Sequence, residues 1–167
     1  MTEAINDYRL PVNKKCLLSV SSDPKTHVGD DKFAIDFEVP EGSDVMAAAP
    51  GKIIFVKTDS REGGDNEKYE DFKYYNHVVL KHTNGEYTEY GHLHFDNPSL
   101  VSLGQKVKRG DIIAHSGNTG YSEKPHVHFS VFKLFKMADD FEKLPPSKKY
   151  FINDSDFGFE TIKVSLK

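Results

Sequence analysis

The 167-residue sequence has a single cysteine and no long apolar run. With Cys16 alone, an intrachain disulfide and a cysteine-based zinc site are both excluded. No stretch approaches the roughly 18–20 apolar residues of a transmembrane helix, so no membrane span is expected. Residues 1–7 lack the basic start and apolar run of an export signal. We therefore expect a cytoplasmic protein, or a secreted or periplasmic one whose export signal has been removed.

An excess of positive charge is also missing, because 26 Asp and Glu outnumber 22 Lys and Arg and give a net charge of −4. Nucleic acid is therefore not expected as a partner, since phosphate binding needs a basic surface. The length suits one domain, and no repeat or linker divides residues 1–167. We expect a single domain, with a monomer favoured although the sequence leaves the oligomeric state open.

Short runs of alternating apolar and polar residues predict strands along most of the chain. These runs are 33–39, 52–57, 78–82, 86–90, 106–108, 111–113, 126–132 and 160–166. Thr83-Asn84-Gly85 and Arg109-Gly110 predict hairpin turns between neighbouring runs. Strands at this spacing favour an all-β fold, an antiparallel β-sandwich or open barrel with little helix. One helix is expected at 134–144, and the long polar loop 59–71 is either mobile or part of a substrate cleft.

Two of the eight histidines, His126 and His128, share one face of a predicted strand, because side chains at i and i+2 point the same way. Two neutral imidazoles in this position can bind one zinc ion, or one can bind metal while the other transfers protons. A polar strand face is the plain alternative. His92 and His94 form a second such pair after the strand 86–90, and spacing alone does not decide between the pairs.

Asp36 lies on the polar side of an otherwise apolar run, 33–37, where an exposed aspartate is the plain alternative to a ligand. His27 precedes it by nine positions, across a segment suited to a loop. Two histidine nitrogens and one carboxylate oxygen from separate elements would leave a fourth zinc position open for water. A catalytic zinc site requires that open position.

Four blocks of the sequence, in a fixed order over about residues 8–132, carry a resemblance to a known family. The blocks are His27-Val28-Gly29 with Phe33-Ala34-Ile35-Asp36-Phe37, the segment from Lys81 to Leu93 that contains His92, the run 101–113 with Gly104 and Gly110, and Ser116-Gly117-Asn118-Thr119-Gly120 followed by Pro125-His126-Val127-His128-Phe129. They resemble the motifs of lysostaphin/LytM-type zinc metallopeptidases, which are peptidoglycan endopeptidases with a duplicated hybrid motif fold.

The resemblance implies that His27, Asp36 and His128 bind one zinc ion per chain in a cleft bordered by long loops. It implies that His92 and His126 flank the metal as acid/base residues. The implied activity is zinc-dependent hydrolysis of peptide bonds, in peptidoglycan cross-links or stem peptides. The chain has no His-Glu-x-x-His sequence, so histidine has to transfer the protons.

This chain departs from the family pattern at two places. Many members have the metal histidine four residues before the aspartate, where this chain has Lys32, a poor zinc ligand. A longer spacing also occurs in the family, and His27 is assigned on that basis. Glu123-Lys124 stand where a small residue and glycine are common, and we expect them to change the charge and width of the cleft.

The other histidines are expected to have no role in the site. His94 is expected to be exposed to solvent, and His77, His82 and His115 to be ordinary strand or turn residues. The rival hypothesis is a non-catalytic regulatory or cell-wall-binding domain on the same fold. Such domains usually lack a ligand or a catalytic histidine, and all five candidates are present here. A sugar-binding β-barrel with incidental histidines accounts less well for four ordered blocks.

Overall fold

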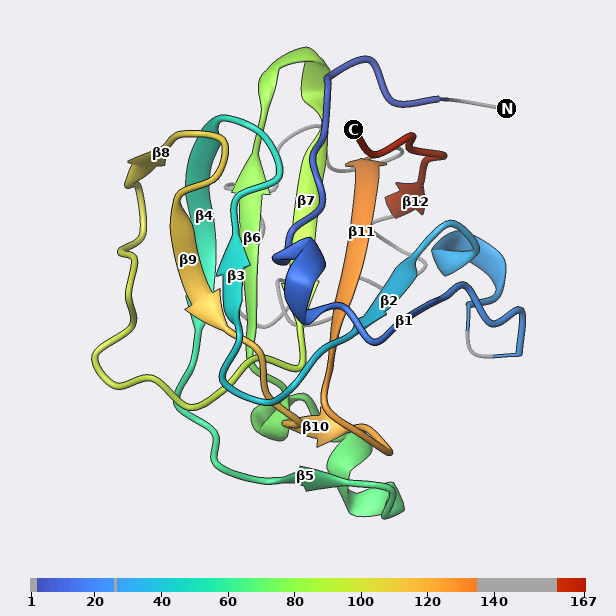
Figure 1. The fold of residues 1–167 in the computed structure, drawn as a ribbon, viewed down its shortest axis with the longest axis vertical. Coiled ribbons are helices and arrows are strands. Elements are labelled where there is room, and N and C mark those ends of the chain that lie inside the picture. Colours follow the sequence, from blue (N-terminus) through green and yellow to red (C-terminus); the bar gives the residue numbers. More distant parts are fainter. Residues whose placement is uncertain (1–2, 26, 135–158) are drawn as a thin grey trace.

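A large sheet forms the centre of the protein in the computed structural model, which describes residues 3–25, 27–134 and 159–167. Its strand order is β1-β2-β11-β7-β6-β4-β8, with β12 also paired to β11 (Figure 1). The strands are β1 (Ser19–Ser21), β2 (Ile35–Glu38), β4 (Gly51–Lys57), β6 (His77–Lys81), β7 (Tyr87–Gly91), β8 (Lys106–Val107), β11 (His126–Leu134) and β12 (Phe159–Thr161). All of these pairings are antiparallel.

Two small ribbons complete the described strands. β3 (Asp44–Met46) and β9 (Ile112–His115) pair antiparallel, whereas β5 (Gly63–Gly64) and β10 (Gly120–Tyr121) pair parallel near one end of the molecule (Figure 1). Helical structure in the described ranges is confined to short 3-10 turns: η1 (Lys14–Cys16), η2 (Gly29–Asp31), η3 (Glu67–Glu70), η4 (Phe72–Tyr74) and η5 (Thr83–Gly85). None of them is long and apolar enough to cross a bilayer. The prediction of an antiparallel all-β fold with little helix is confirmed.

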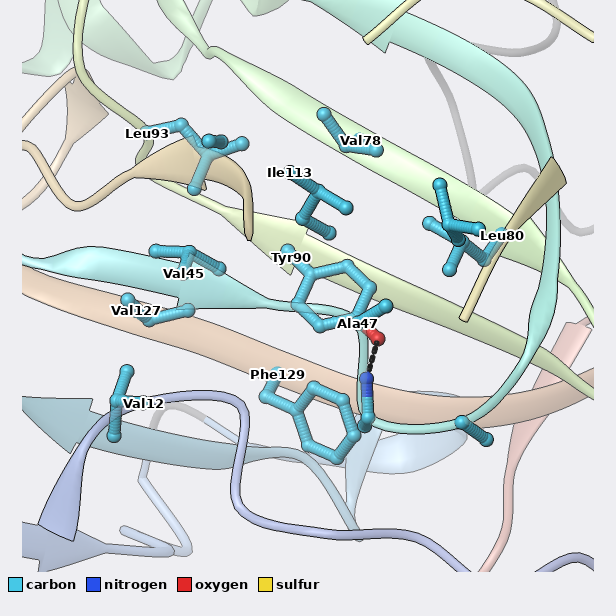
Figure 2. Close-up of a cluster of buried hydrophobic side chains, with 14 of the residues drawn as sticks. Val12, Val45, Ala47, Val78, Leu80, Tyr90, Leu93, Ile113, Val127 and Phe129 are labelled. Carbon is cyan, nitrogen blue, oxygen red and sulfur yellow. Dashed lines mark hydrogen bonds between the residues drawn. The ribbon is translucent and has the colours of Figure 1, made fainter. Parts of the chain in front are cut away.

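The main core packs the β3–β9 ribbon against one face of the large sheet. Alternation along β11 turns Val127 and Phe129 into this core, and both side chains are fully buried. The ring of Tyr90 from β7 lies 5.4 Å from that of Phe129, between centroids. Its hydroxyl accepts a hydrogen bond of 2.8 Å from the backbone N–H of Ala48 (Figure 2). The one polar atom of this buried side chain is therefore satisfied, as burial requires.

The opposite face of the large sheet carries a smaller apolar cluster of Ile54, Val79, Tyr87 and Phe132. The rings of Tyr87 and Phe132 stack there at 5.3 Å between centroids. Phe132 and His128 are four residues apart on β11, so their side chains project from the same face. This face of the sheet therefore carries the apolar cluster near Phe132 and the histidines His126 and His128 at the other end of β11.

The predicted turn at Asn84 lies between the paired strands β6 and β7, and its φ of 61° is the left-handed value that such a turn favours.

The hairpin predicted around Arg109-Gly110 is wrong. The turn exists, with Asp111 donating its N–H to the carbonyl of Lys108 at 3.1 Å. Its flanking strands pair elsewhere, β8 with β4 and β9 with β3, because the chain crosses here from one sheet to the other. The helix expected at 134–144 falls almost wholly outside the described residues.

Candidate metal centre and catalytic cleft

The β-ladder places the candidate ligands side by side. β11 pairs with β2 so that His128 stands opposite Asp36 and His126 opposite Glu38. On its other side β11 pairs with β7, which sets Gly91 opposite His128. Directly opposed side chains in an antiparallel pair project to the same face. Asp36 and His128 therefore meet because of strand register, although they are 92 residues apart in the sequence.

His27 reaches this pair from the loop before η2, and its side chain is almost fully buried. Its Nε2 lies 3.4 Å from Oδ2 of Asp36, while Nδ1 of His128 lies 3.1 Å from Oδ1 of the same carboxylate. One ligand atom from each of the three residues lies within 4.8 Å of the others, and no other such group occurs in the described ranges. The structure thus brings the three predicted metal residues together.

These three residues fit a zinc ion by donor type and by distance. Two imidazole nitrogens and a carboxylate oxygen are ordinary zinc donors, and in a tetrahedral site donors about 2.0–2.2 Å from the ion lie roughly 3.4 Å apart. The two nitrogens lie 3.4 Å and 3.1 Å from carboxylate oxygens of Asp36, close to that spacing. Nδ1 of His27 is buried with no hydrogen-bond partner among the described residues, so the Nε2 side carries this ring's polar contact.

The pKa values of the pair reflect their mutual contact. Burial alone would raise the pKa of Asp36, but hydrogen bonds from His128 and His27 outweigh it and lower that pKa. Burial alone would lower the pKa of His128, but its hydrogen bond to Asp36 and the negative charge of Asp31 raise it to about 9. In the metal-free protein the protonated imidazole of His128 therefore pairs with the ionised carboxylate of Asp36. Their surroundings favour a positive charge at this position.

His92 and His126 lie beside the cluster, and both are held in one tautomer by the backbone. His92 follows β7 directly, at a φ of 57°, and its Nδ1 lies 2.7 Å from the carbonyl oxygen of Thr119. Nδ1 of His126 lies 2.8 Å from the carbonyl oxygen of Lys124. A carbonyl only accepts, so Nδ1 carries the proton in both rings and Nε2 is left as the acceptor.

Both of these imidazoles are neutral at pH 7. Burial, together with repulsion from His126 and His128 in their protonated forms, lowers the pKa of His92 to about 3. Burial also lowers the pKa of His126, against the raising effect of its hydrogen bond to the carbonyl of Lys124. Nε2 of His126 lies 3.8 Å from Oδ1 of Asp36. Two proton acceptors thus stand at the border of the candidate metal position.

An open cleft of about 460 Å³ runs over this part of the sheet. It is lined by Ser19, Ser21, Asp23, His27, Asp31, Asp36, Glu38, His92, Tyr121, Ser122, Glu123, Lys124, His126 and His128. Glu123 and Lys124, where the sequence departs from the family pattern, are in its wall, and Nζ of Lys124 lies 2.7 Å from Oε2 of Glu38. Loop 59–71 contributes nothing to this lining; it instead contains β5 and η3.

Some contacts of the site could not be inferred from sequence patterns. The ring of Tyr75 lies edge-on to His92, with 4.9 Å between centroids, and its hydroxyl donates to Oε1 of Glu89 at 2.9 Å. A Cβ on Gly91 would collide with that hydroxyl, so this glycine makes the space for Tyr75. In the sequence, only the glycine that precedes His92 could have indicated that a bulky side chain packs there. No sequence feature indicated that Asp31 contacts His128.

The remaining histidines lie outside the cluster. The side chain of His94 is 43% exposed, as expected. His77 is buried in β6 beside Glu89, and His82 is buried with its ring nitrogens on Pro50 and Thr88. His115 in β9 pairs with Asp96 at 3.1 Å. None of these four lines the cleft.

A His-Asp-His cluster of this kind, built on an antiparallel sheet, is typical of the lysostaphin/LytM class of metallopeptidases. The chain belongs to that class by sequence as well: it is a member of peptidase family M23, whose family model matches residues 31–140. The match begins four residues after His27. It therefore covers Asp36 and His128 but not the histidine assigned from the longer spacing.

Individual relatives agree with the family assignment. The peptidoglycan DD-endopeptidase ShyA of Vibrio cholerae is 33% identical over 128 residues, 74% of this chain and 26% of that protein. An uncharacterized metalloprotease of Buchnera aphidicola is 31% identical over 129 residues, 74% of this chain and 30% of that protein. A solved zinc containing peptidase from Vibrio cholerae matches with a TM-score of 0.53 and 30% identity, over 75% of this chain and 36% of that one. This chain spans less than a third of the length of these two curated relatives.

Proposed function

We propose that this chain is a zinc-dependent endopeptidase that hydrolyses peptide bonds in peptidoglycan, in the cross-links or stem peptides. The observation that carries the proposal is the convergence of His27, Asp36 and His128, whose ligand atoms lie within 4.8 Å of one another. The relatives add support, since one is named a peptidoglycan DD-endopeptidase and another a zinc containing peptidase.

In this proposal one zinc ion per chain is held by Nε2 of His27, a carboxylate oxygen of Asp36 and Nδ1 of His128. Zinc bound by three protein ligands lowers the pKa of a water ligand toward about 7 and polarises a substrate carbonyl. The pairing of β11 with β2, rather than the packing of loops, fixes the positions of two of the three donors, Asp36 and His128. That arrangement holds the donors in place before any ion arrives.

His92 and His126 then carry the protons. Each presents an unprotonated Nε2, because its Nδ1 proton is engaged by a backbone carbonyl. One imidazole accepts the proton of the attacking water, and protonated imidazole returns a proton to the leaving amine. General acid–base catalysis of this kind contributes typically 10²–10⁴-fold to the rate. The two anchored rings supply the role that glutamate has in other zinc peptidases.

The cleft favours an extended peptide over a bulky folded partner. Its floor next to the cluster is formed by two small side chains of the edge strand β1, Ser19 and Ser21, which stand opposite Glu38 and Asp36. The ion pair of Lys124 and Glu38 borders the same floor. Small side chains on the floor of this open cleft leave room for an extended peptide next to the candidate ligands.

The test is digestion of purified, cross-linked peptidoglycan, with the released muropeptides separated and identified by mass. We expect cross-linked dimers to be converted to monomers, activity to be lost on treatment with a chelator, and one equivalent of Zn²⁺ to restore it. A pentaglycine peptide, assayed in parallel, distinguishes a glycine-bridge peptidase from one acting on stem peptides or direct cross-links. Binding of peptidoglycan without any new amine would instead favour the non-catalytic cell-wall-binding domain.

A further inference from the structure

The imidazole of His128 lies between two carboxylates. Nδ1 is 3.1 Å from Oδ1 of Asp36, and Nε2 is 3.7 Å from Oδ2 of Asp31. Both carboxylates have low exposure, with 24% of each side chain accessible, and both line the cleft. The two sides of the ring are thus occupied by different acids.

Asp31 is not part of the ligand cluster itself. In the described ranges, the one group of three residues whose ligand atoms all lie within 4.8 Å of one another is His27, Asp36 and His128. The two nitrogens of an imidazole point away from each other, so a group that contacts Nε2 does not share an ion bound at Nδ1. Asp31 therefore contacts a metal residue from outside the cluster.

We propose that Asp31 is a positioning residue that accepts the Nε2–H of His128 and so keeps the Nδ1 lone pair directed at the metal; this rests on the proposed zinc function. Metal-binding histidines usually donate their second N–H to a carboxylate or carbonyl, which fixes the tautomer and the ring orientation. A shift of about 1 Å from the observed 3.7 Å gives a charge-assisted hydrogen bond of roughly 2.8 Å.

The backbone explains why Asp31 stands there. The 3-10 turn η2 begins at Gly29, whose φ of 59° is a conformation that glycine adopts without strain. Within the turn Asp31 donates its N–H to the carbonyl of Val28 at 3.1 Å, and its own carbonyl accepts from Ala34 at 3.0 Å. The segment that lengthens the spacing between His27 and Asp36 thus delivers a carboxylate to the third metal residue.

The experiment measures zinc affinity by competition with a chromophoric chelator, with Zn²⁺ alone as the probe. We expect Asp31→Ala to weaken zinc binding 10–100-fold, the range found when such carboxylates are removed from metal-bound histidines. Asp31→Asn keeps the shape and a weaker acceptor, so a smaller loss is expected. Glu123→Gln is the matched control: it removes one negative charge from the same cleft, and zinc affinity is expected to stay within twofold.

A second readout reports the ring itself. Long-range ¹H–¹⁵N spectra of the zinc-loaded protein are expected to show His128 with Nδ1 on the metal and a slowly exchanging Nε2 proton. That proton is expected to exchange faster in Asp31→Asn and Asp31→Ala. Thermal unfolding of the metal-free forms establishes that each variant is folded before its affinity is compared.

The outcomes separate the two claims. Wild-type affinity and an unchanged Nε2 proton in both Asp31 variants overturn the positioning role and leave the zinc peptidase proposal standing. An equal loss in Glu123→Gln also overturns it, since charge alone would then explain the effect. A wild-type protein that binds no zinc overturns the proposed function itself.

Discussion

The imidazole rings of His92 and His126 lie 4.5 Å apart between centroids, although one follows β7 and the other begins β11. Each is held by its Nδ1 on a backbone carbonyl, at 2.7 Å from Thr119 for the first and 2.8 Å from Lys124 for the second. Two anchored rings with the same tautomer present two equivalent acceptor atoms at one side of the metal cluster. In the proposed mechanism, proton transfer and metal binding therefore belong to different histidines.

His126→Ala tests that division of roles. We expect the rate of peptidoglycan hydrolysis to fall by about 10²-fold or more, because the alanine cannot transfer a proton. Bound zinc is expected to remain near one per chain by atomic absorption, because His126 is not among the three proposed ligands. His94→Ala, at an exposed side chain outside the cleft, serves as the control and is expected to retain full activity. An active His126→Ala protein would disprove the assignment.

A pair of alanine variants decides which residue of the first motif binds zinc. His27→Ala is expected to lose most of its zinc, since it removes one of three donors from the cluster. Lys32→Ala, at the position where many family members have the metal histidine, is expected to keep zinc and activity. Metal content after gel filtration measures both. Loss of zinc from Lys32→Ala with full loading of His27→Ala would reverse the ligand assignment.

The raised pKa of His128 predicts how the stability of the metal-free protein depends on pH. Its ordinary pKa is about 6.5, and contact with Asp36 and Asp31 raises it to about 9 in the folded state. A raised pKa favours the folded state while the group is protonated, so this contribution is complete below pH ~6.5 and is lost as pH rises to about 9. The loss is at most about 3 kcal/mol.

Urea unfolding in the presence of a chelator, from pH 6 to 9.5, measures this pH dependence. His128→Asn cannot titrate in this range and is expected to show a flatter profile between pH 6.5 and 9. If the free energy of unfolding depends on pH in the same way in both proteins, protonation of His128 does not contribute to stability, and this prediction is wrong.

The core hydrogen bond of Tyr90 predicts a stability effect away from the cleft. Tyr90→Phe leaves the buried N–H of Ala48 without its acceptor, and an unsatisfied buried group costs about 1–3 kcal/mol. The free energy of unfolding from urea titration is expected to fall by that amount. Tyr121→Phe, at a side chain 45% exposed, is expected to change it by less than about 0.5 kcal/mol.

Much of the site was predictable because it lies on regular strands. Alternation put His126 and His128 on one face of a strand, and it put Asp36 on the polar side of another. Those two inferences need only the local period of a strand, and the structure has both strands. Which His-x-His pair meets Asp36 depends on strand pairing across 92 residues, and no local pattern contains that information.

Other features were beyond sequence patterns for physical reasons. β1 is three exposed residues and β5 is two glycines, and neither has an apolar period to detect. The contact of Asp31 with His128 depends on the direction that the chain takes through the 3-10 turn at Gly29. Residue composition does not determine that direction. The positions of short strands and of side chains on loops therefore require the three-dimensional structure.

The ladder that joins residue 36 to residue 128 has a consequence for synthesis. In a growing chain β2 is synthesised before its partner β11. The candidate metal cluster is therefore incomplete until residue 128 has left the ribosome and β11 has paired with β2. A slip of one position would turn the imidazole of His128 inward and bring Val127 to the surface of the cleft. In the proposed zinc site, the ion is therefore bound only after these two distant strands have paired in the correct register.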